Sequence, residues 1–500
     1  MHLRTGIRWI SYSHRLLNTN AYKIAIIGTG PGGFYTAHHL LNKSSPDMKL
    51  SIDFFERLPT PFGLSRYGVA PDHPEVKNCE EYLVDIMNDF GNGDNQRHSV
   101  RFLGNVDVGK DISLDMLQKH YNSVVLAYGC TAADNKLNIP GGDNLPGVMP
   151  ARQFVNWYNG HPDYYETGSK FIPPSLDKIE DVSIIGNGNV ALDVARILLA
   201  DPKEHWARTD ISTEAQALLE KSTVKNVRIV GRRGVLESAF SNKEIRELFE
   251  LENASFIPMD DSLLSSIDRS NLGRVNKRKL SIIEKFNVSP KEDKTPKSHT
   301  WSLEYLKSPI KFTLNPQDPT LLASTTFVEN ELVHDPLIPY VKCKPTSKQT
   351  ELKNELVIVS IGYQGTPLTG FEELGIWFEN NKLQNKQGRV LSVESKDNEH
   401  NAVFKTGFYT AGWIKTGPKG VIATTMMDSF DTADKMLEDL TNNHALKIED
   451  ERDITQVLNK DIVHWKNWGK LDAYELEKGK ELGKVRYKVC NKQEMLERAL

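Results

Sequence analysis

The 500-residue sequence has few cysteines, no long apolar run and no strong excess of charge. Its four cysteines are far apart and never form a CxxC pair, which argues against a zinc or iron–sulfur site and a dithiol redox motif. They are Cys79, Cys130, Cys343 and Cys490. No apolar run approaches the ~18 residues that cross a bilayer. The net charge of −4 gives no basis for nucleic-acid binding. We expect free thiols in a reducing compartment, no metal and no nucleic-acid partner.

Acidic residues are absent from the start of the chain, where the first one is Asp47. The same segment carries Arg4, Arg8 and Arg15 among apolar residues. An arginine-bearing, acid-free and potentially amphipathic leader is typical of a mitochondrial transit peptide. We therefore predict a transit peptide over residues 1–20. The alternative is a short tail whose charges arose by chance.

A glycine fingerprint, GTGPGG at residues 28–33, lies between an apolar strand pattern at 24–27 and a helix pattern near 32–42. In a dinucleotide-binding turn, Gly28 permits the tight bend, Gly30 the close approach of a diphosphate, and Gly33 the packing of helix on strand. The free N–H groups at the start of the helix then hold the diphosphate. A second strand pattern at 51–55 ends in Glu56, where a carboxylate can accept ribose hydroxyls. The alternative for Glu56 is a solvated strand end.

A second fingerprint, GNGNVA at residues 186–191, follows the apolar run 182–185 and precedes a helix pattern at 190–199. The next strand pattern, 227–230, ends not in an acid but in Gly231 followed by Arg232 and Arg233. Arginines bind a 2′-phosphate that an acid would repel, which favours NADP over NAD. The alternative is that the two arginines only form surface ion pairs. Two fingerprints in one chain indicate two dinucleotides held face to face in an electron-transfer enzyme.

The length is too great for one hydrophobic core, and the order of patterns predicts two α/β dinucleotide-binding domains, one inserted in the other. A strand at 124–127 and a turn-rich crossing at 139–147 close the first part, and helical spacing continues around Ala215. The apolar run 356–361 predicts a strand at the return into the first domain. A lysine-rich exposed loop is expected at 286–300, and a helix at 421–440 after the glycine-rich stretch 412–420. The expected division is a transit peptide at 1–20, a first dinucleotide-binding domain at 21–133 and 364–500, and the NADP-binding domain at 134–363, between its two parts.

Several longer segments resemble the mitochondrial NADPH:adrenodoxin (ferredoxin) reductases, and the resemblance covers nearly the whole chain after the leader. They are Gly63-Leu64 and residues 68–77 (GVAPDHPEVK), 188–196 (GNVALDVAR), 231–234 (GRRG) and 417–430. The resemblance implies a glutathione-reductase-like, two-domain flavoprotein that binds FAD and NADP. The chain differs from the family at Gly32, where other members often have alanine; we expect this difference to be harmless. It differs more in the loops near 286–300 and 394–401.

The resemblance also implies site residues. FAD would contact Gly32, Glu56, Leu64, Val108, Trp413, Gly420, Val421 and Ile422. NADPH would contact Asn187, Gly188, Asn189, Val190, Arg232, Arg233, Glu244 and Gly420. The start of the helix at Val421 would stabilise a reduced, anionic flavin through its dipole. No catalytic side chain is identified; His73 either manages protons at or contacts the flavin, or is a structural histidine that bonds within its own loop.

The implied activity is transfer of electrons from NADPH, one at a time, to a mitochondrial [2Fe–2S] ferredoxin, in support of iron–sulfur, heme or steroid-type pathways. Residues 221–300 carry about five more basic than acidic side chains. The densest cluster, Arg274, Lys277, Arg278 and Lys279, is predicted to dock an acidic ferredoxin; the alternative is a solvated helix face. We expect a matrix protein with at most peripheral association with the inner membrane. Another NADPH flavoenzyme of the monooxygenase type and a non-catalytic nucleotide sensor remain alternatives; the missing dithiol argues against a disulfide reductase.

Overall fold

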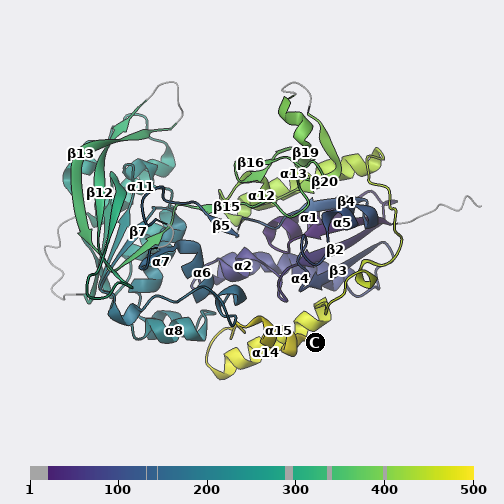
Figure 1. Cartoon of the computed structure of the whole chain (residues 1–500), viewed down its shortest axis with the longest axis horizontal. Helices are drawn as coiled ribbons and strands as arrows, with labels where there is room; N and C mark the ends of the chain where they lie inside the picture. The colour runs from purple at the N-terminus through teal and green to yellow at the C-terminus, as the bar shows by residue number, and fades with distance from the viewer. Residues whose placement is uncertain (1–20, 131, 143–144, 288–296, 335–339, 398–401) are drawn as a thin grey trace, which may run out of the picture.

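The computed structural model describes residues 21–130, 132–142, 145–287, 297–334, 340–397 and 402–500. The predicted leader, most of the loop predicted at 286–300, and residues 398–401 of the divergent stretch lie outside the described residues. Two lobes, each built on a mainly parallel sheet, are joined by a narrow waist, and the C-terminal helices run below both of them (Figure 1).

The first lobe holds a seven-stranded sheet in the order β18-β19-β20-β4-β1-β2-β3. Strand β1 pairs in parallel with β2 and β4, and its residues Ile24 and Ile26 are fully buried. A strand buried on both faces is a continuous apolar run, as the sequence shows here. The strands are β1 (Tyr22–Ile27), β2 (Leu50–Glu56), β3 (His98–Gly104), β4 (Ser123–Leu126), β18 (Asn385–Lys386), β19 (Arg389–Leu391) and β20 (Phe404–Thr410).

Helices pack against this sheet. Helix α1 (Pro31–Lys43) packs along α13 (Ile422–Thr441), so that two segments almost 400 residues apart in sequence lie side by side. The other helices of the lobe are α2 (Leu64–Tyr67), α3 (Pro74–Lys77), α4 (Glu81–Phe90), α5 (Leu114–His120) and α12 (Trp413–Thr416). A small hairpin joins β16 (Phe378–Glu379) to β17 (Lys382–Leu383).

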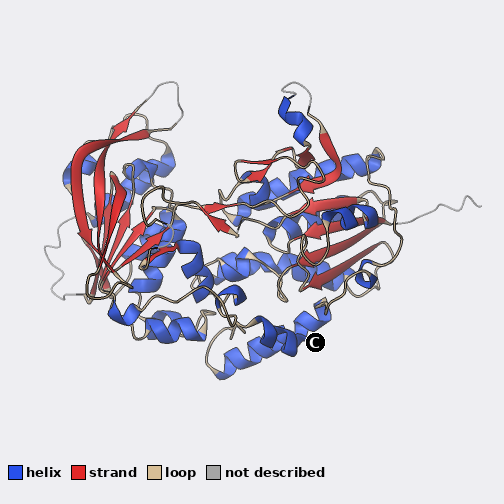
Figure 2. Cartoon of the chain, in the orientation of Figure 1, coloured by secondary structure: helices blue, strands red, loops and turns tan. Residues whose placement is uncertain are grey.

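The second lobe holds a six-stranded sheet in the order β6-β14-β7-β8-β10-β9, and a three-stranded antiparallel sheet β11-β12-β13 beside it (Figure 2). The strands are β6 (Val148–Pro150), β7 (Asp181–Ile185), β8 (Asn226–Val230), β9 (Ala254–Phe256), β10 (His299–Glu304), β11 (Lys307–Leu314), β12 (Leu322–Val333), β13 (Lys342–Lys353) and β14 (Leu356–Val359). The helices are α6 (Ala151–Tyr158), α7 (Asn189–Leu199), α8 (Thr213–Leu219), α9 (Asn242–Phe249), α10 (Asp261–Ser265) and α11 (Arg274–Phe286).

The two-domain dinucleotide-binding fold is confirmed, but two local predictions are wrong. The apolar run 356–361 was interpreted as the return into the first domain, although the predicted boundary at 363 places it in the second; as strand β14 it pairs in parallel with β7, in the second sheet. An apolar run predicts burial between layers but not the sheet that receives it. The bounds of the loop predicted at 286–300 are also too wide, because Phe286 ends α11 and His299 begins β10.

The waist consists of β5 (Ala133–Asp134) paired antiparallel with β15 (Tyr363–Gln364). The chain leaves the first lobe through one strand of this ribbon and returns through the other (Figure 1). We propose the domain boundaries at 133/134 and 363/364. Below the lobes lie α14 (Trp465–Glu481) and α15 (Lys492–Ala499). No helix among the described residues is long and apolar enough to cross a membrane.

Candidate functional site

The first fingerprint forms a turn that only glycine can make. Gly28 has φ of +100°, and a Cβ there would lie 2.6 Å from the carbonyl oxygen of Ala127. A Cβ on Gly33 would lie 2.1 Å from the carbonyl oxygen of Gly28, so that helix α1 can approach the strand only with glycine there. Gly32 packs against Gly412, where an added Cβ would lie 3.0 Å from the Cα. Alanine at position 32 would therefore require these two backbones to separate slightly.

A cavity of about 470 Å³ opens in front of this turn. This volume is within the range of small-molecule and cofactor sites. Eight of the residues predicted to bind FAD line it: Gly28, Gly30, Gly32, Glu56, Leu64, Val108, Trp413 and Ile422. Gly33, Gly420 and Val421 do not. Gly33 lies behind the turn, while Gly420 and Val421 are exposed at the start of α13, next to Ile422.

Two helix N-termini face this region without any side-chain cap. Helix α1 begins after Gly30 and α13 after Val421; neither N-cap residue makes a side-chain hydrogen bond, and neither first turn contains an acid. Uncapped N–H groups and the helix dipole favour an anionic ligand. Gly129, which also lines the cavity, leaves open space where its Cβ would be. The polar and steric features of the cavity therefore fit a dinucleotide such as FAD.

Glu56 lies at the end of β2 with its carboxylate at the cavity wall. One oxygen, Oε2, accepts hydrogen bonds from the Thr29 hydroxyl (2.6 Å) and backbone N–H (3.2 Å), and Oε1 accepts one from the Leu58 N–H (3.1 Å). A carboxylate has about four acceptor positions, so Glu56 keeps capacity for a ribose hydroxyl. The contacts hold the side chain in place rather than leaving it in solvent.

The second fingerprint repeats this geometry at α7. Gly186 has φ of +122°, and a Cβ there would lie 2.0 Å from the carbonyl oxygen of Ser360. Gly188 precedes the helix, makes no side-chain cap, and has nothing within 4 Å of where its Cβ would be. The Asn189 Oδ1 atom accepts a hydrogen bond from the Ser241 N–H at 2.7 Å, which ties the turn to the start of α9. An uncapped helix start facing open space is again suited to a diphosphate.

Arg232 and Arg233 follow β8, one strand away from this turn. Arg232 is exposed and Arg233 half-buried. Among the residues that the structure describes, neither guanidinium forms an ion pair, so surface pairing does not account for them. Two unpaired guanidinium groups near a diphosphate site can bind a further phosphate.

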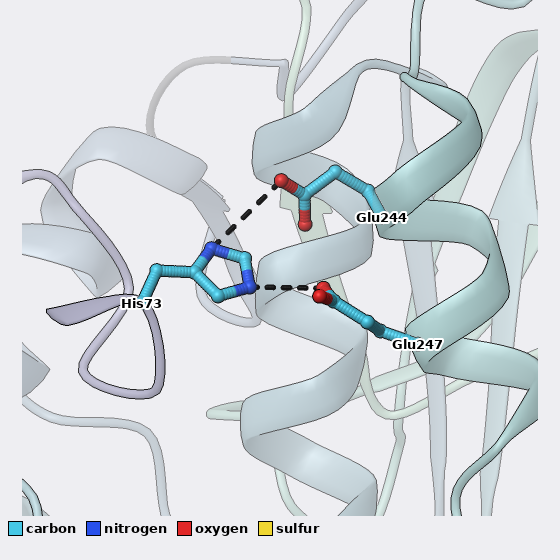
Figure 3. Close-up of side chains that lie close together, drawn as sticks. All are labelled: His73, Glu244 and Glu247. Atoms are coloured by element: carbon cyan, nitrogen blue, oxygen red, sulfur yellow. Dashed lines mark hydrogen bonds and ion pairs between the residues drawn. The ribbon is translucent and has the colours of Figure 1, made fainter. Parts of the chain in front are cut away.

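Glu244 lies in an ion-pair network between the lobes (Figure 3). Its Oε2 is 3.2 Å from Arg196 Nη1, and its Oε1 is 3.8 Å from His73 Nδ1. Burial, together with the charge of Asp193, raises the pKa of Glu244 to about 7. The predicted contact from Glu244 to NADPH would therefore have to compete with these partners.

His73, from the first lobe, bonds across the junction rather than within its own loop. Its Nε2 lies 2.9 Å from Glu247 Oε2 on α9 (Figure 3). Asp72 pairs through both oxygens with Arg196 of α7, at 2.7 and 3.0 Å. His73, Glu244 and Glu247 could together reach a metal ion, but the Arg196 guanidinium already lies 3.2 Å from His73 Nε2. The network joins the two lobes, and His73 does not line the cavity.

The predicted docking cluster divides into two faces of α11. Arg274, Lys277 and Arg278 are exposed on one face, as their spacing requires. The prediction is wrong for Lys279, which is 4% exposed: its Nζ donates to the Ser238 carbonyl at 2.6 Å and lies over the Phe240 ring. Lys279 belongs to the apolar face with Leu280 and Ile283, so a partner cannot reach it.

The second lobe supplies cavity residues that the sequence did not reveal. Arg152, Asn156, His161 and Asp163 all line the cavity from α6 and the turn after it. Tyr67 and Cys130 of the first lobe were also missed. Arg57 also lines the cavity, and among these residues only its position could have been inferred from the sequence, because it directly follows Glu56, the predicted ribose acid.

Known proteins resemble this chain along nearly its whole length, although no protein-family model matches it. A Saccharomyces cerevisiae protein named "Probable NADPH:adrenodoxin oxidoreductase, mitochondrial" is 38% identical over 97% of this chain and 98% of its own length. The human NADPH:adrenodoxin oxidoreductase, mitochondrial, is 38% identical over 95% of this chain and 91% of its own. The solved structure of Mycobacterium tuberculosis FprA in complex with NADPH superposes with a TM-score of 0.83 at 33% identity, covering 96% of this chain and all of that one.

Proposed function

The chain belongs to the NADPH:adrenodoxin oxidoreductase family, and we propose from this premise that it passes electrons from NADPH through FAD, one at a time, to a mitochondrial [2Fe–2S] ferredoxin. The main support for the proposal is that the strand after each glycine fingerprint ends in side chains of opposite charge. The first is followed by Glu56, and the second by Arg232 and Arg233. One site thus suits an unphosphorylated ribose and the other a 2′-phosphate.

The residues of the chain around the cavity bind and orient the FAD. Bound FAD supplies the redox chemistry, because a flavin accepts a hydride and returns its electrons singly. Gly28 and Gly30 allow the backbone to approach the FAD diphosphate closely, and Glu56 accepts hydrogen bonds from the ribose hydroxyls. The N-terminus of α13, with Ile422 in the cavity wall, would favour negative charge on a flavin bound there through its helix dipole.

The NADPH site lies across the second fingerprint. Asn187, Gly188, Asn189 and Val190 present the uncapped start of α7 to its diphosphate, and the two arginines bind the 2′-phosphate. Gly420, exposed beside Ile422, is proposed to contact both cofactors, and Val421 is proposed to contact FAD. We assign Glu244 to the junction between the lobes, beside this site, because its carboxylate pairs with Arg196.

The partner and location follow from the family. The protein acts in mitochondria on a ferredoxin, and we infer that the partner is acidic and docks on the exposed face formed by Arg274, Lys277 and Arg278. Residues 1–20 are proposed as the transit peptide. Any membrane association is proposed to be peripheral, on the matrix side of the inner membrane.

Ferredoxin-dependent reduction of cytochrome c tests the function. Purified protein with NADPH is expected to reduce cytochrome c rapidly only when a mitochondrial-type [2Fe–2S] ferredoxin is added, because the ferredoxin carries single electrons away from the flavin. Ferricyanide serves as the control acceptor that needs no ferredoxin. A protein that reduces ferricyanide with NADPH but never a ferredoxin would instead be another flavoenzyme, and one that does neither would be a nucleotide-binding protein without this activity.

FAD is expected to be held without a covalent bond, although Cys130 lines the cavity. Burial raises the pKa of the Cys130 thiol to about 12, and the thiol donates to the Trp413 carbonyl at 3.0 Å. A neutral thiol is a poor nucleophile. Acid precipitation should therefore release all of the yellow chromophore into the supernatant, from the wild type and from Cys130→Ser alike. Flavin that stays with the wild-type pellet but not with the Cys130→Ser pellet would contradict this.

A further inference from the structure

Two charged side chains from different lobes meet at the wall of the FAD cavity. Arg57 follows β2 in the first lobe, and Asp163 lies in a short 3-10 turn, η2 (Pro162–Tyr164), in the second. Arg57 Nη1 donates to Asp163 Oδ1 and Nη2 to Oδ2, each at 3.0 Å. Both residues line the cavity, and each side chain is 43% exposed. The pair therefore bridges the lobes where the cavity meets solvent.

The turn that carries Asp163 is fixed to the second lobe. The Tyr164 hydroxyl accepts a hydrogen bond from Arg152 Nη1 at 2.8 Å, and the Tyr165 hydroxyl donates to the Trp157 carbonyl at 2.7 Å. Both anchors lie on α6. Because the turn cannot swing away by itself, separating Arg57 from Asp163 requires the ion pair to break or the lobes to move apart.

His161 precedes this turn and also lines the cavity. Its Nδ1 accepts the backbone N–H of Asp163 at 3.3 Å, and its ring lies 4.8 Å from that of Tyr67. Burial lowers the pKa of His161 to about 4, so the imidazole is neutral near pH 7. In a neutral imidazole whose Nδ1 accepts, Nε2 carries the proton. His161 thus brings a hydrogen-bond donor from the second lobe to the cavity.

We propose that the segment 161–163 of the second lobe is a clasp that retains FAD, closed by the Arg57–Asp163 ion pair. The proposal rests on the assignment of this cavity to FAD. The fingerprint and Glu56 hold the cofactor from the first lobe only. The clasp covers it from the other lobe, so FAD leaves only after the pair opens. Arg57 and Asp163 are positioning residues: they affect how long FAD stays rather than the electron transfer itself.

The rate of FAD release tests the clasp. Release is followed by the rise in flavin fluorescence after holoenzyme is diluted into FAD-free buffer. Because the pair is half-exposed, its loss in Asp163→Ala is expected to speed release by about fivefold. Asp163→Asn keeps the side-chain shape but not the charge, so its FAD release rate should lie between those of the wild type and Asp163→Ala. Glu180→Ala is the matched control, since it removes a surface ion pair to Lys225 (2.7 Å) whose residues do not line the cavity; its release rate should equal that of the wild type.

A charge exchange separates the ion pair from a general loss of structure. Arg57→Asp alone places two carboxylates together and should release FAD faster than Asp163→Ala. Adding Asp163→Arg should slow release again toward the wild-type rate. Equal release from the wild type and Asp163→Ala, or no recovery in the exchanged pair, would overturn the clasp while leaving the cavity assignment intact. A wild-type protein that binds no FAD would instead overturn the proposed function.

Discussion

Replacing both Arg232 and Arg233 by alanine is expected to raise the KM for NADPH roughly 100-fold while leaving NADH kinetics nearly unchanged. Each hydrogen bond from a guanidinium to a phosphate contributes about 1.5–3 kcal/mol, and two at the lower end of that range, about 3 kcal/mol together, account for a change of this size. NADH lacks the 2′-phosphate, so it loses no such contact. Ferricyanide reduction at varied NADPH and NADH measures both constants without the ferredoxin.

The structure makes this prediction sharper than the sequence alone, because neither guanidinium has an ion-pair partner among the described residues. Removing the arginines should therefore leave no carboxylate unpaired, and folding should be little affected. Arg246→Ala, a half-buried arginine on α9, is the control for loss of positive charge in the same lobe. Equal losses with NADPH and NADH would mean that the two arginines support the fold rather than the choice of cofactor.

The local parts of the site could be predicted from the sequence because their signals are local. Gly28 and Gly186 are required by backbone conformations within a few residues of each fingerprint, and Glu56 and the two arginines follow at fixed distances along the chain. Strand β14 shows the limit of such reasoning. Its apolar run indicated a buried strand, but the sheet that receives it depends on pairing with β7, which lies about 170 residues earlier.

Residues brought together only by tertiary structure left no comparable signal. His161 and Asp163 reach the FAD cavity because the second lobe packs against the first, and nothing in their neighbourhood of the sequence indicates this. Lys279 is different, since its burial could have been predicted. In α11, Leu280 and Ile283 define the inward face, and position 279 lies on that side, whereas 274, 277 and 278 lie opposite. Lys279 was included in the docking cluster because basic residues were counted along the sequence without considering which face of the helix each one occupies.

Reversing the charges of Arg274 and Arg278 to glutamate is expected to abolish most ferredoxin-dependent cytochrome c reduction while leaving FAD content and ferricyanide reduction intact. Both side chains are exposed on one face of α11, and neither forms an ion pair among the described residues. Attraction between a basic surface and an acidic partner sets the rate of encounter, and salt screens it over about 10 Å at 0.1 M. The wild-type rate at subsaturating ferredoxin should therefore fall as salt is raised, and the slow variant should respond much less.

Partner binding must be separated from a general effect of charge, because the double reversal changes the net charge by four units. Lys466→Glu with Lys470→Glu makes the same change on exposed positions of α14, which lies below the lobes and away from α11 (Figure 1). That control should keep most of the ferredoxin-dependent rate, since steering depends on charge near the contact surface. Lys279 is left unaltered in both variants, because its Nζ is bonded inside the lobe and its loss would disturb folding. If the α11 variant retained wild-type ferredoxin kinetics with its FAD in place, the docking surface would lie elsewhere, and the exposed face of α11 would be a solvated helix surface.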